Sequence, residues 1–270
     1  MPATVRVSAA AAVAVATTFA GASSLHAGSD QPQPGRPAAN GATAMPHATP
    51  PLSAELTAYL DAREAEFDRI TEARKAELAQ LGAHIAEALA ADGSAKLTFI
   101  CTHNSRRSHM SQLWAAAAAT RVGLAGVETF SGGTEETAFN PRAVAALSRA
   151  GFDIRAEDGA MANPHYRVHM LAAGQAETPM TCFSKIYDKA PNPSEDFGAV
   201  MVCNSANEAC PIVYGADFRL PITYVDPKAH DGTTKEAWAY DERCAQIARE
   251  LLYAMRLAAT PAATAGAETE

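Results

Sequence analysis

The most extended periodic pattern of apolar residues lies in residues 53–91. Leucine, isoleucine and phenylalanine recur there every three, four, seven or eight positions, and charged residues fill the positions between them. That spacing puts the apolar side chains on one face of a helix. Ser53, which follows two prolines, is a suitable N-cap, and the Asp92-Gly93 pair is a suitable end. We therefore expect a helical segment, with at most one break, that packs on the rest of the chain; a dimer-forming helix is the alternative.

From residue 96 onward, short apolar runs alternate with helical patterns. The predicted strands are residues 97–100, 127–130, 197–202 and 219–224. The predicted helices are residues 108–122, 140–150 and 234–257, the last with Thr234 as its cap. Residues 151–154 are a connection or a short edge strand, and residues 161–192 are less regular. Strands that alternate with helices indicate an α/β fold with a central parallel sheet flanked by helices, here with an extra N-terminal helical segment. Functional loops are expected at the carboxyl ends of the strands.

The two ends of the chain differ in composition from the middle. Residues 8–22 are rich in alanine and valine, one arginine precedes them, and small residues follow, which is typical of a secretory signal peptide. We divide the chain into a signal peptide (1–27), a disordered linker (28–52), a helical extension (53–92), a main domain (96–258) and a disordered tail (259–270). A periplasmic or secreted location follows; the alternative is a cytoplasmic protein with a disordered, alanine-rich extension.

Composition narrows the class of protein. The 270 residues are 48% hydrophobic and 19% charged, with a net charge of −8. The negative charge and the lack of an extended basic run argue against nucleic acid as a partner. No apolar stretch is long enough for stable insertion into a membrane. Five cysteines are too few and too irregular for a disulfide scaffold, so individual thiols are candidates for chemistry.

The strongest candidate is Cys101, at the junction between a predicted strand and a predicted helix. Backbone N–H groups converge at such a junction and form an anion site with the helix N-terminus. Both features favour the thiolate, which is the nucleophilic form of cysteine. Arg107 can bind two oxygens of a tetrahedral oxyanion, and Ser108 can donate a hydrogen bond to the sulfur. The alternative is that Cys101 has no chemical role and only packs in the core. The residues expected to bind the oxyanion are Thr102, His103, Asn104, Ser105, Arg106, Arg107 and Ser108.

The spacing Cys-x5-Arg-Ser resembles the signature loop of the low-molecular-weight protein tyrosine phosphatases. The fuller string, Cys101-Thr102-x-Asn104-Ser105-x-Arg107-Ser108, is most similar to the thioredoxin-coupled arsenate reductases, which share that fold. The resemblance covers residues 96–257. It implies a thiol-dependent enzyme without a metal or an organic cofactor. In the phosphatases an Asp-Pro pair on a late loop protonates the leaving oxygen, which implies this role for Asp226, stiffened by Pro227.

Cys203 and Cys210 resemble the redox segment of the arsenate reductases. The resemblance implies that Cys101 attacks arsenate, Cys203 attacks the arsenic adduct and releases arsenite, and Cys210 closes a disulfide with Cys203. A thioredoxin-like thiol reductant would reopen that disulfide. From the residues alone the pair could instead pack, form an idle disulfide or bind a metal. Metal binding is disfavoured because no companion Cys/His pair has the usual ligand spacing.

The loop also departs from the reductase pattern. His103 and Arg106 stand where that family usually carries Gly and Cys, and asparagine and serine replace the acidic residues after the second redox cysteine. We expect reduction of arsenate to arsenite through Cys101, with Cys203 and Cys210. The alternative is a phosphatase that hydrolyses phosphomonoesters, and a third hypothesis is a non-catalytic oxyanion-binding or redox-sensing module. His109 is expected at the surface or as a cap, and Cys244 in the core.

Overall fold

The computed structural model describes residues 50–157 and 161–260. The predicted signal peptide, all but the last residues of the predicted linker and nearly all of the predicted tail lie outside the described residues. Within the described part of the chain, no helix combines the length and apolar character needed to cross a membrane.

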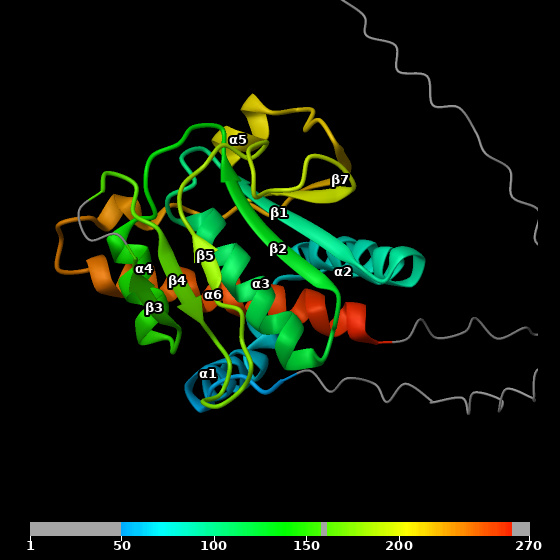
Figure 1. Cartoon of the computed structure of the whole chain (residues 1–270), viewed down its shortest axis with the longest axis horizontal. Coiled ribbons are helices and arrows are strands. Elements are labelled where there is room, and N and C mark those ends of the chain that lie inside the picture. The colour runs from blue at the N-terminus through cyan, green and yellow to red at the C-terminus, as the bar shows by residue number, and fades with distance from the viewer. Residues whose placement is uncertain (1–49, 158–160, 261–270) are drawn as a thin grey trace, which may run out of the picture. The chain divides into compact units, whose positions relative to one another are not determined.

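The main sheet has four parallel strands in the order β2-β1-β6-β7. Strands β1 and β2 lie side by side in Figure 1. They are β1 (Ala95–Cys101), β2 (Val127–Gly133), β6 (Phe197–Met201) and β7 (Ala216–Pro221). The predicted central parallel sheet flanked by helices is confirmed. Strand β2 is three residues longer than predicted, because Ser131, Gly132 and Gly133 pair with the end of β1. Glycine is required at position 132, where a Cβ atom would lie 2.3 Å from the Tyr187 Cα atom.

Two long helices, α3 (Arg107–Val122) and α6 (Glu236–Ala259), pack against each other, and α3 also packs on β1 and β2. The shorter helices are α4 (Pro141–Arg149), α5 (Asn204–Ala209) and the 3-10 helix η2 (Pro227–His230). Helix α6 is capped at Lys235 rather than at the predicted Thr234. The helices place three loops at the carboxyl end of the sheet: the loop after β1, the start of α5 after β6, and the segment between β7 and η2.

A second sheet was not anticipated from the sequence. Its three antiparallel strands are β3 (Asp153–Ala156), β4 (Tyr166–His169) and β5 (Met180–Cys182). Only a connection or short edge strand was expected near β3, and the region of β4 and β5 was described as irregular. Strands of three or four residues are too short to show a clear alternation of apolar and polar positions, so their pairing is not readable from the chain.

The N-terminal extension forms α1 (Ala54–Glu64), the 3-10 helix η1 (Phe67–Arg69) and α2 (Glu72–Asp92), a helical segment with one break. Ser53 caps α1, and Thr71 caps α2 after the break. The apolar face predicted for this segment is fully buried at Leu56, Leu60, Leu78, Leu81 and Ile85. Burial of each such side chain contributes about 1.5–3 kcal/mol. The extension therefore shares one hydrophobic core with the main sheet.

Candidate active site

The loop after β1 has a shape that depends on Asn104. This residue has a φ of +43°, a left-handed conformation that asparagine tolerates better than most residues. Its Oδ1 atom accepts a hydrogen bond from the Lys185 N–H at 2.9 Å, and its Nδ2 atom donates to Ser108 Oγ at 2.9 Å. The Asn104 side chain therefore holds the loop in place and is not itself free to bind an oxyanion.

Cys101 ends β1 and is 3% exposed. Its Sγ atom lies 3.1 Å from Ser108 Oγ. Because Ser108 Oγ already accepts a hydrogen bond from Asn104, the Ser108 hydroxyl hydrogen is free to point at the sulfur. A hydrogen bond donated to sulfur stabilises a thiolate, in the way the sequence predicts.

Arg107, just after this loop, forms an ion pair with Asp226. Arg107 Nη2 lies 2.8 Å from Asp226 Oδ2, and Nη1 donates to the Tyr224 carbonyl at 3.0 Å. The Arg107 Nε atom is buried and has no hydrogen-bond partner in the described part of the chain. These two side chains and Cys101 line one narrow pocket of about 180 Å³, which His103, Ser105 and Arg106 complete. An oxyanion bound there would give the orphaned Nε–H group an acceptor.

The side chain of Arg106, which precedes Arg107 in the chain, contacts Tyr240 of α6 and Asp231 in the segment before α6. Its Nε atom donates to Tyr240 Oη at 2.8 Å, and its Nη2 atom lies 3.5 Å from Asp231 Oδ2. Tyr240 in turn donates to Asp231 Oδ1 at 2.8 Å. Burial, together with the hydrogen bond to Asp231, raises the pKa of Tyr240 to about 12, so this phenol stays neutral. Arg106 therefore ties the loop to α6, with its charge balanced by Asp231.

The remaining predicted oxyanion-binding residues differ in where their side chains point. Thr102 Oγ1 lies 3.5 Å from the Sγ atom of Cys203, the N-cap residue of α5. His103 is about half exposed, and its Nε2 atom lies 3.4 Å from a carboxylate oxygen of Glu135. The structure thus brings the predicted residues together in one loop, but places only some of their side chains on the pocket.

His109 lies in a different place from the one that the sequence predicts. It is fully buried, not at the surface, and its ring stacks on Phe139 with 4.0 Å between centroids. Its Nδ1 atom lies 3.3 Å from Asn104 Nδ2. Burial holds the pKa of His109 well below its usual range, so the neutral ring accepts from the Asn104 amide. The missed signal is the i, i+4 spacing from His109 to Leu113, which places both on the buried face of α3.

Cys203 and Cys210 lie at opposite ends of α5. Cys203 is 1% exposed and caps the helix by accepting from the Ala206 N–H at 3.4 Å, and Cys210 is partly exposed at the other end. A helical rise of about 1.5 Å per residue separates their Cα atoms by roughly 10 Å. A disulfide needs Cα atoms within about 7 Å. The predicted Cys203–Cys210 disulfide therefore requires α5 to unwind.

The other two cysteines have no part in the pocket. Cys244, expected in the core, is buried and accepts a hydrogen bond from the Trp114 indole at 3.2 Å. Cys182 is fully buried at the end of β5. Burial raises the pKa of each of these thiols to about 12, which leaves them protonated and unreactive at neutral pH.

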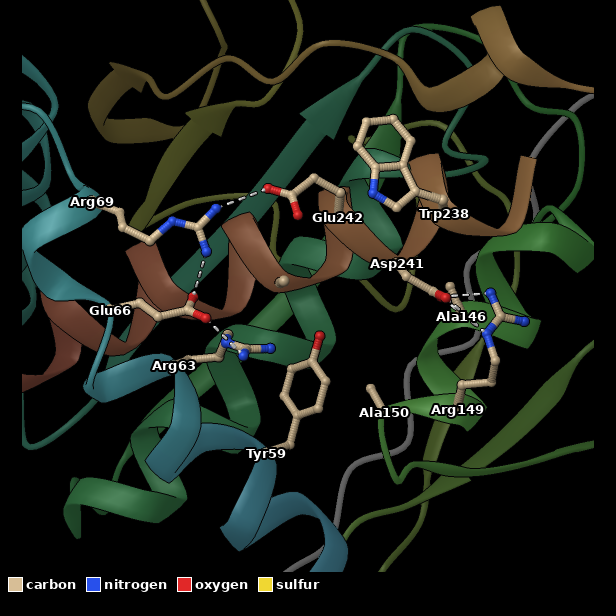
Figure 2. Close-up of a pocket in the computed structure, with 11 residues that line it drawn as sticks. Tyr59, Arg63, Glu66, Arg69, Ala146, Arg149, Ala150, Trp238, Asp241 and Glu242 are labelled. Carbon is tan, nitrogen blue, oxygen red and sulfur yellow. Dashed lines mark hydrogen bonds and ion pairs between the residues drawn. The ribbon is translucent and has the colours of Figure 1, made fainter. Parts of the chain in front are cut away.

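A larger pocket lies between α1, η1, α4 and α6 (Figure 2) and has a volume of about 680 Å³. Its charged side chains are paired with one another. The ion pairs join Arg149 to Asp241, Arg63 to Glu66 and Arg69 to Glu242. No cysteine or serine lines it, and its acids and bases neutralise each other. The reactive groups are therefore in the Cys101 pocket.

Comparison with known proteins gives one family match. Residues 96–171 match the family model described as low molecular weight phosphotyrosine protein phosphatase. A search of curated proteins gave no match.

Three solved structures are similar in fold, each at low identity. A low molecular weight phosphotyrosine phosphatase (VcLMWPTP-2) from Vibrio cholerae O395 is 12% identical, with 59% of this chain and 94% of that chain covered and a TM-score of 0.40. A YwlE mutant from Bacillus subtilis is 16% identical, with 60% and 97% covered and a TM-score of 0.42. A low molecular weight protein tyrosine phosphatase from T. tengcongensis is 15% identical, with 58% and 95% covered and a TM-score of 0.38.

The family match includes the entire Cys101 loop and the start of α3. The closer similarity to arsenate reductases stays a prediction. The resemblance to the low-molecular-weight protein tyrosine phosphatase superfamily, first seen in the spacing from Cys101 to Ser108, is confirmed.

Proposed function

We propose that this protein hydrolyses phosphomonoesters with Cys101 as nucleophile. The observation that carries the proposal is the pocket that Cys101, Arg107 and Asp226 line together. The family match supports a cysteine-dependent phosphatase, and so it favours this alternative over the arsenate reduction expected from the sequence.

In the first step the Cys101 thiolate attacks the phosphorus atom. A sulfur–phosphorus bond forms while the bond from phosphorus to the ester oxygen breaks. Arg107 and the loop N–H groups bind the phosphoryl oxygens, which carry the negative charge of the transition state. The dianionic substrate competes with Asp226 for Arg107 and so opens the 2.8 Å ion pair. Once this pair is open, the Asp226 carboxylate takes up a proton from solvent beside the charged substrate, and the resulting carboxyl group gives that proton to the departing oxygen.

In the second step water breaks the phosphoenzyme. The Asp226 carboxylate takes a proton from a water molecule, whose oxygen attacks phosphorus as the sulfur–phosphorus bond breaks. The products are inorganic phosphate and the Cys101 thiolate, with Asp226 protonated for the next cycle. One ester and one water give one alcohol and one phosphate, without a cofactor.

The test is an assay of the purified protein with p-nitrophenyl phosphate, followed by acid quenching and mass mapping of Cys101. We expect turnover and a transient phosphoryl group on the Cys101 peptide. A protein that binds inorganic phosphate but turns over no ester would overturn the proposal in favour of a non-catalytic oxyanion-binding module.

Arsenate reduction is the second candidate, favoured by the 3.5 Å contact from Cys203 Sγ to Thr102 Oγ1 in the loop. Cys101 would displace water from arsenate, and Cys203 would attack the Cys101 sulfur. The electron pair of the sulfur–arsenic bond stays on arsenic, which leaves as arsenite. Cys210 would then attack Cys203 and free Cys101, once α5 unwinds, and an external dithiol would reduce the Cys203–Cys210 disulfide.

This candidate is separated from simple hydrolysis by Cys203→Ser, assayed with arsenate plus thioredoxin and with p-nitrophenyl phosphate. Loss of arsenite release with ester hydrolysis intact supports arsenate reduction. Equal loss of both activities, or loss of neither, contradicts it.

We also propose export through the N-terminal signal-like segment, on the sequence pattern alone. N-terminal sequencing of the native protein tests it: a start near residue 28 supports export, and an intact Met1 rejects it.

A further inference from the structure

We infer that Arg74, in the N-terminal extension, positions the segment that carries Asp226. The inference rests on the proposed function, in which Asp226 is the general acid. It adds to the site a residue that lies outside the matched residues 96–171, on a helix that precedes the main sheet in the sequence.

The contact that carries the inference runs from Arg74 to the backbone just before Asp226. Arg74 Nη2 donates to the Thr223 carbonyl oxygen at 2.8 Å. The next carbonyl, that of Tyr224, accepts from Arg107 Nη1 at 3.0 Å. Two successive carbonyls are thus held by arginines from two different helices, α2 and α3. Asp226 follows two residues later and pairs with the same Arg107.

The guanidinium of Arg74 is fixed on its other sides as well. It lies over the Tyr224 ring, 5.6 Å from its centroid, and Nε lies 3.4 Å from Glu250 Oε2 on α6. Glu250 is only 5% exposed, so Arg74 supplies the cation that this buried carboxylate needs. Nη1 pairs with Glu77 at 2.7 Å. Lysine has a single ammonium group and cannot reproduce this forked arrangement.

Helix α2, which carries Arg74, is capped at its start and packs closely on α6. Arg74 lies in the first turn of α2, where its N–H is capped by Thr71 Oγ1 at 3.3 Å. Farther along, Gly82 lets α2 approach α6 so closely that a Cβ atom at this position would lie 2.9 Å from the Ala254 carbonyl oxygen. The ion pair from Arg69 to Glu242, visible in Figure 2, fastens the preceding η1 helix to α6 as well. A fixed helix can transmit a fixed position to the Thr223–Asp226 backbone.

The experiment compares two esters that differ in their need for a general acid. The p-nitrophenolate ion is a weak base and leaves readily without a proton, whereas the more basic phenolate needs one from the general acid. Displacement of Asp226 therefore slows the hydrolysis of phenyl phosphate more than that of p-nitrophenyl phosphate. In Arg74→Met and Arg74→Lys we expect kcat/KM to fall about tenfold for phenyl phosphate and about twofold for p-nitrophenyl phosphate. The matched control is Arg256→Met, which removes a 2.9 Å pair from α6 to Glu64 on α1 without touching the Thr223 segment.

The ratio of the two kcat/KM values separates positioning from a general loss of stability. A changed ratio in both Arg74 variants, with an unchanged ratio in Arg256→Met, supports the inference. An unchanged ratio in a folded Arg74 variant overturns it and leaves the proposed function intact. A wild-type protein inactive towards both esters overturns the proposed function itself. Arg74→Lys keeps a cation beside Glu250, so it serves if Arg74→Met fails to fold.

Discussion

Cys101 and Cys203 lie at the carboxyl ends of two neighbouring parallel strands, yet their surroundings differ. Cys101 is the last residue of β1, and Cys203 lies two residues after the end of β6. Each is at most 3% exposed, and a helix follows each. Five residues separate Cys101 from α3, whereas Cys203 is itself the N-cap of α5. The two thiols therefore differ in whether a loop separates them from the helix that follows.

The loop makes the chemical difference. Five residues give room for a left-handed turn at Asn104, and Ser108, just after the loop, lies 3.1 Å from the sulfur through its Oγ atom. The cap position of Cys203 instead directs its sulfur to a single N–H group, that of Ala206. Asp226 and Arg107 complete the pocket only at Cys101 among the described residues. A strand, a cysteine and a helix thus deliver a thiol, and the intervening loop turns it into an anion site.

The largest effect on kcat/KM should come from replacing each of the two cysteines by serine in separate variants. Cys101→Ser should lower kcat/KM for p-nitrophenyl phosphate by at least about 10³-fold, because serine is a poor nucleophile without a base beside it. Cys203→Ser should change the same value less than twofold. Steady-state assays of both variants test this, and comparable losses would show that the two sites are not chemically distinct.

The next effect concerns the carboxyl group that only the Cys101 pocket contains. Asp226→Asn keeps the shape of the side chain but removes the proton donor, so kcat/KM for phenyl phosphate should fall by about 10²-fold. The loss for p-nitrophenyl phosphate should be several times smaller. If both esters lose rate equally, Asp226 acts on binding and not on the leaving oxygen.

A smaller effect is expected from the loop geometry itself. Asn104→Ala removes the bonds to Lys185, Ser108 and His109 and strains the left-handed turn, so activity should fall about tenfold. Asn104→Gly relieves the strain but not the lost bonds. Asn207→Ala, on α5, is the matched control and should leave kcat/KM unchanged. Full activity in Asn104→Gly would assign the whole effect to backbone strain.

The last prediction concerns the alkylation of the other four cysteines and involves no change in turnover. It is best measured in Cys101→Ser, where the nucleophile is absent. With iodoacetamide at pH 8, partly exposed Cys210 should be alkylated before buried Cys203. Cys182 and Cys244, with pKa values of about 12, carry roughly 1000-fold less thiolate than a cysteine of pKa 9 and should react only on unfolding. Peptide mapping over time checks the order. Early labelling of Cys203 would indicate that α5 opens readily.

The sequence by itself determined the elements with a strong local signal. The apolar stripe of residues 53–91, the strands β1, β2 and β6 and the spacing from Cys101 to Ser108 are readable because their causes lie within a few residues. Strand β7 spans Ala216–Pro221, so the predicted strand at residues 219–224 is placed three residues too late. Alternation of strands and helices was enough to predict the parallel sheet, since parallel strands need long crossovers. The short strands β3, β4 and β5 carry too few residues for such a signal.

Only the tertiary structure decided which distant side chains meet. The pairing of Arg107 with Asp226 joins residues 119 positions apart, and the contact from Arg74 to Thr223 spans 149 positions. The stacking of the His109 ring on Phe139 likewise joins α3 to a segment beyond β2. Local spacing fixes which way a side chain points from its own helix or strand. What it meets there is fixed by the packing of the whole core.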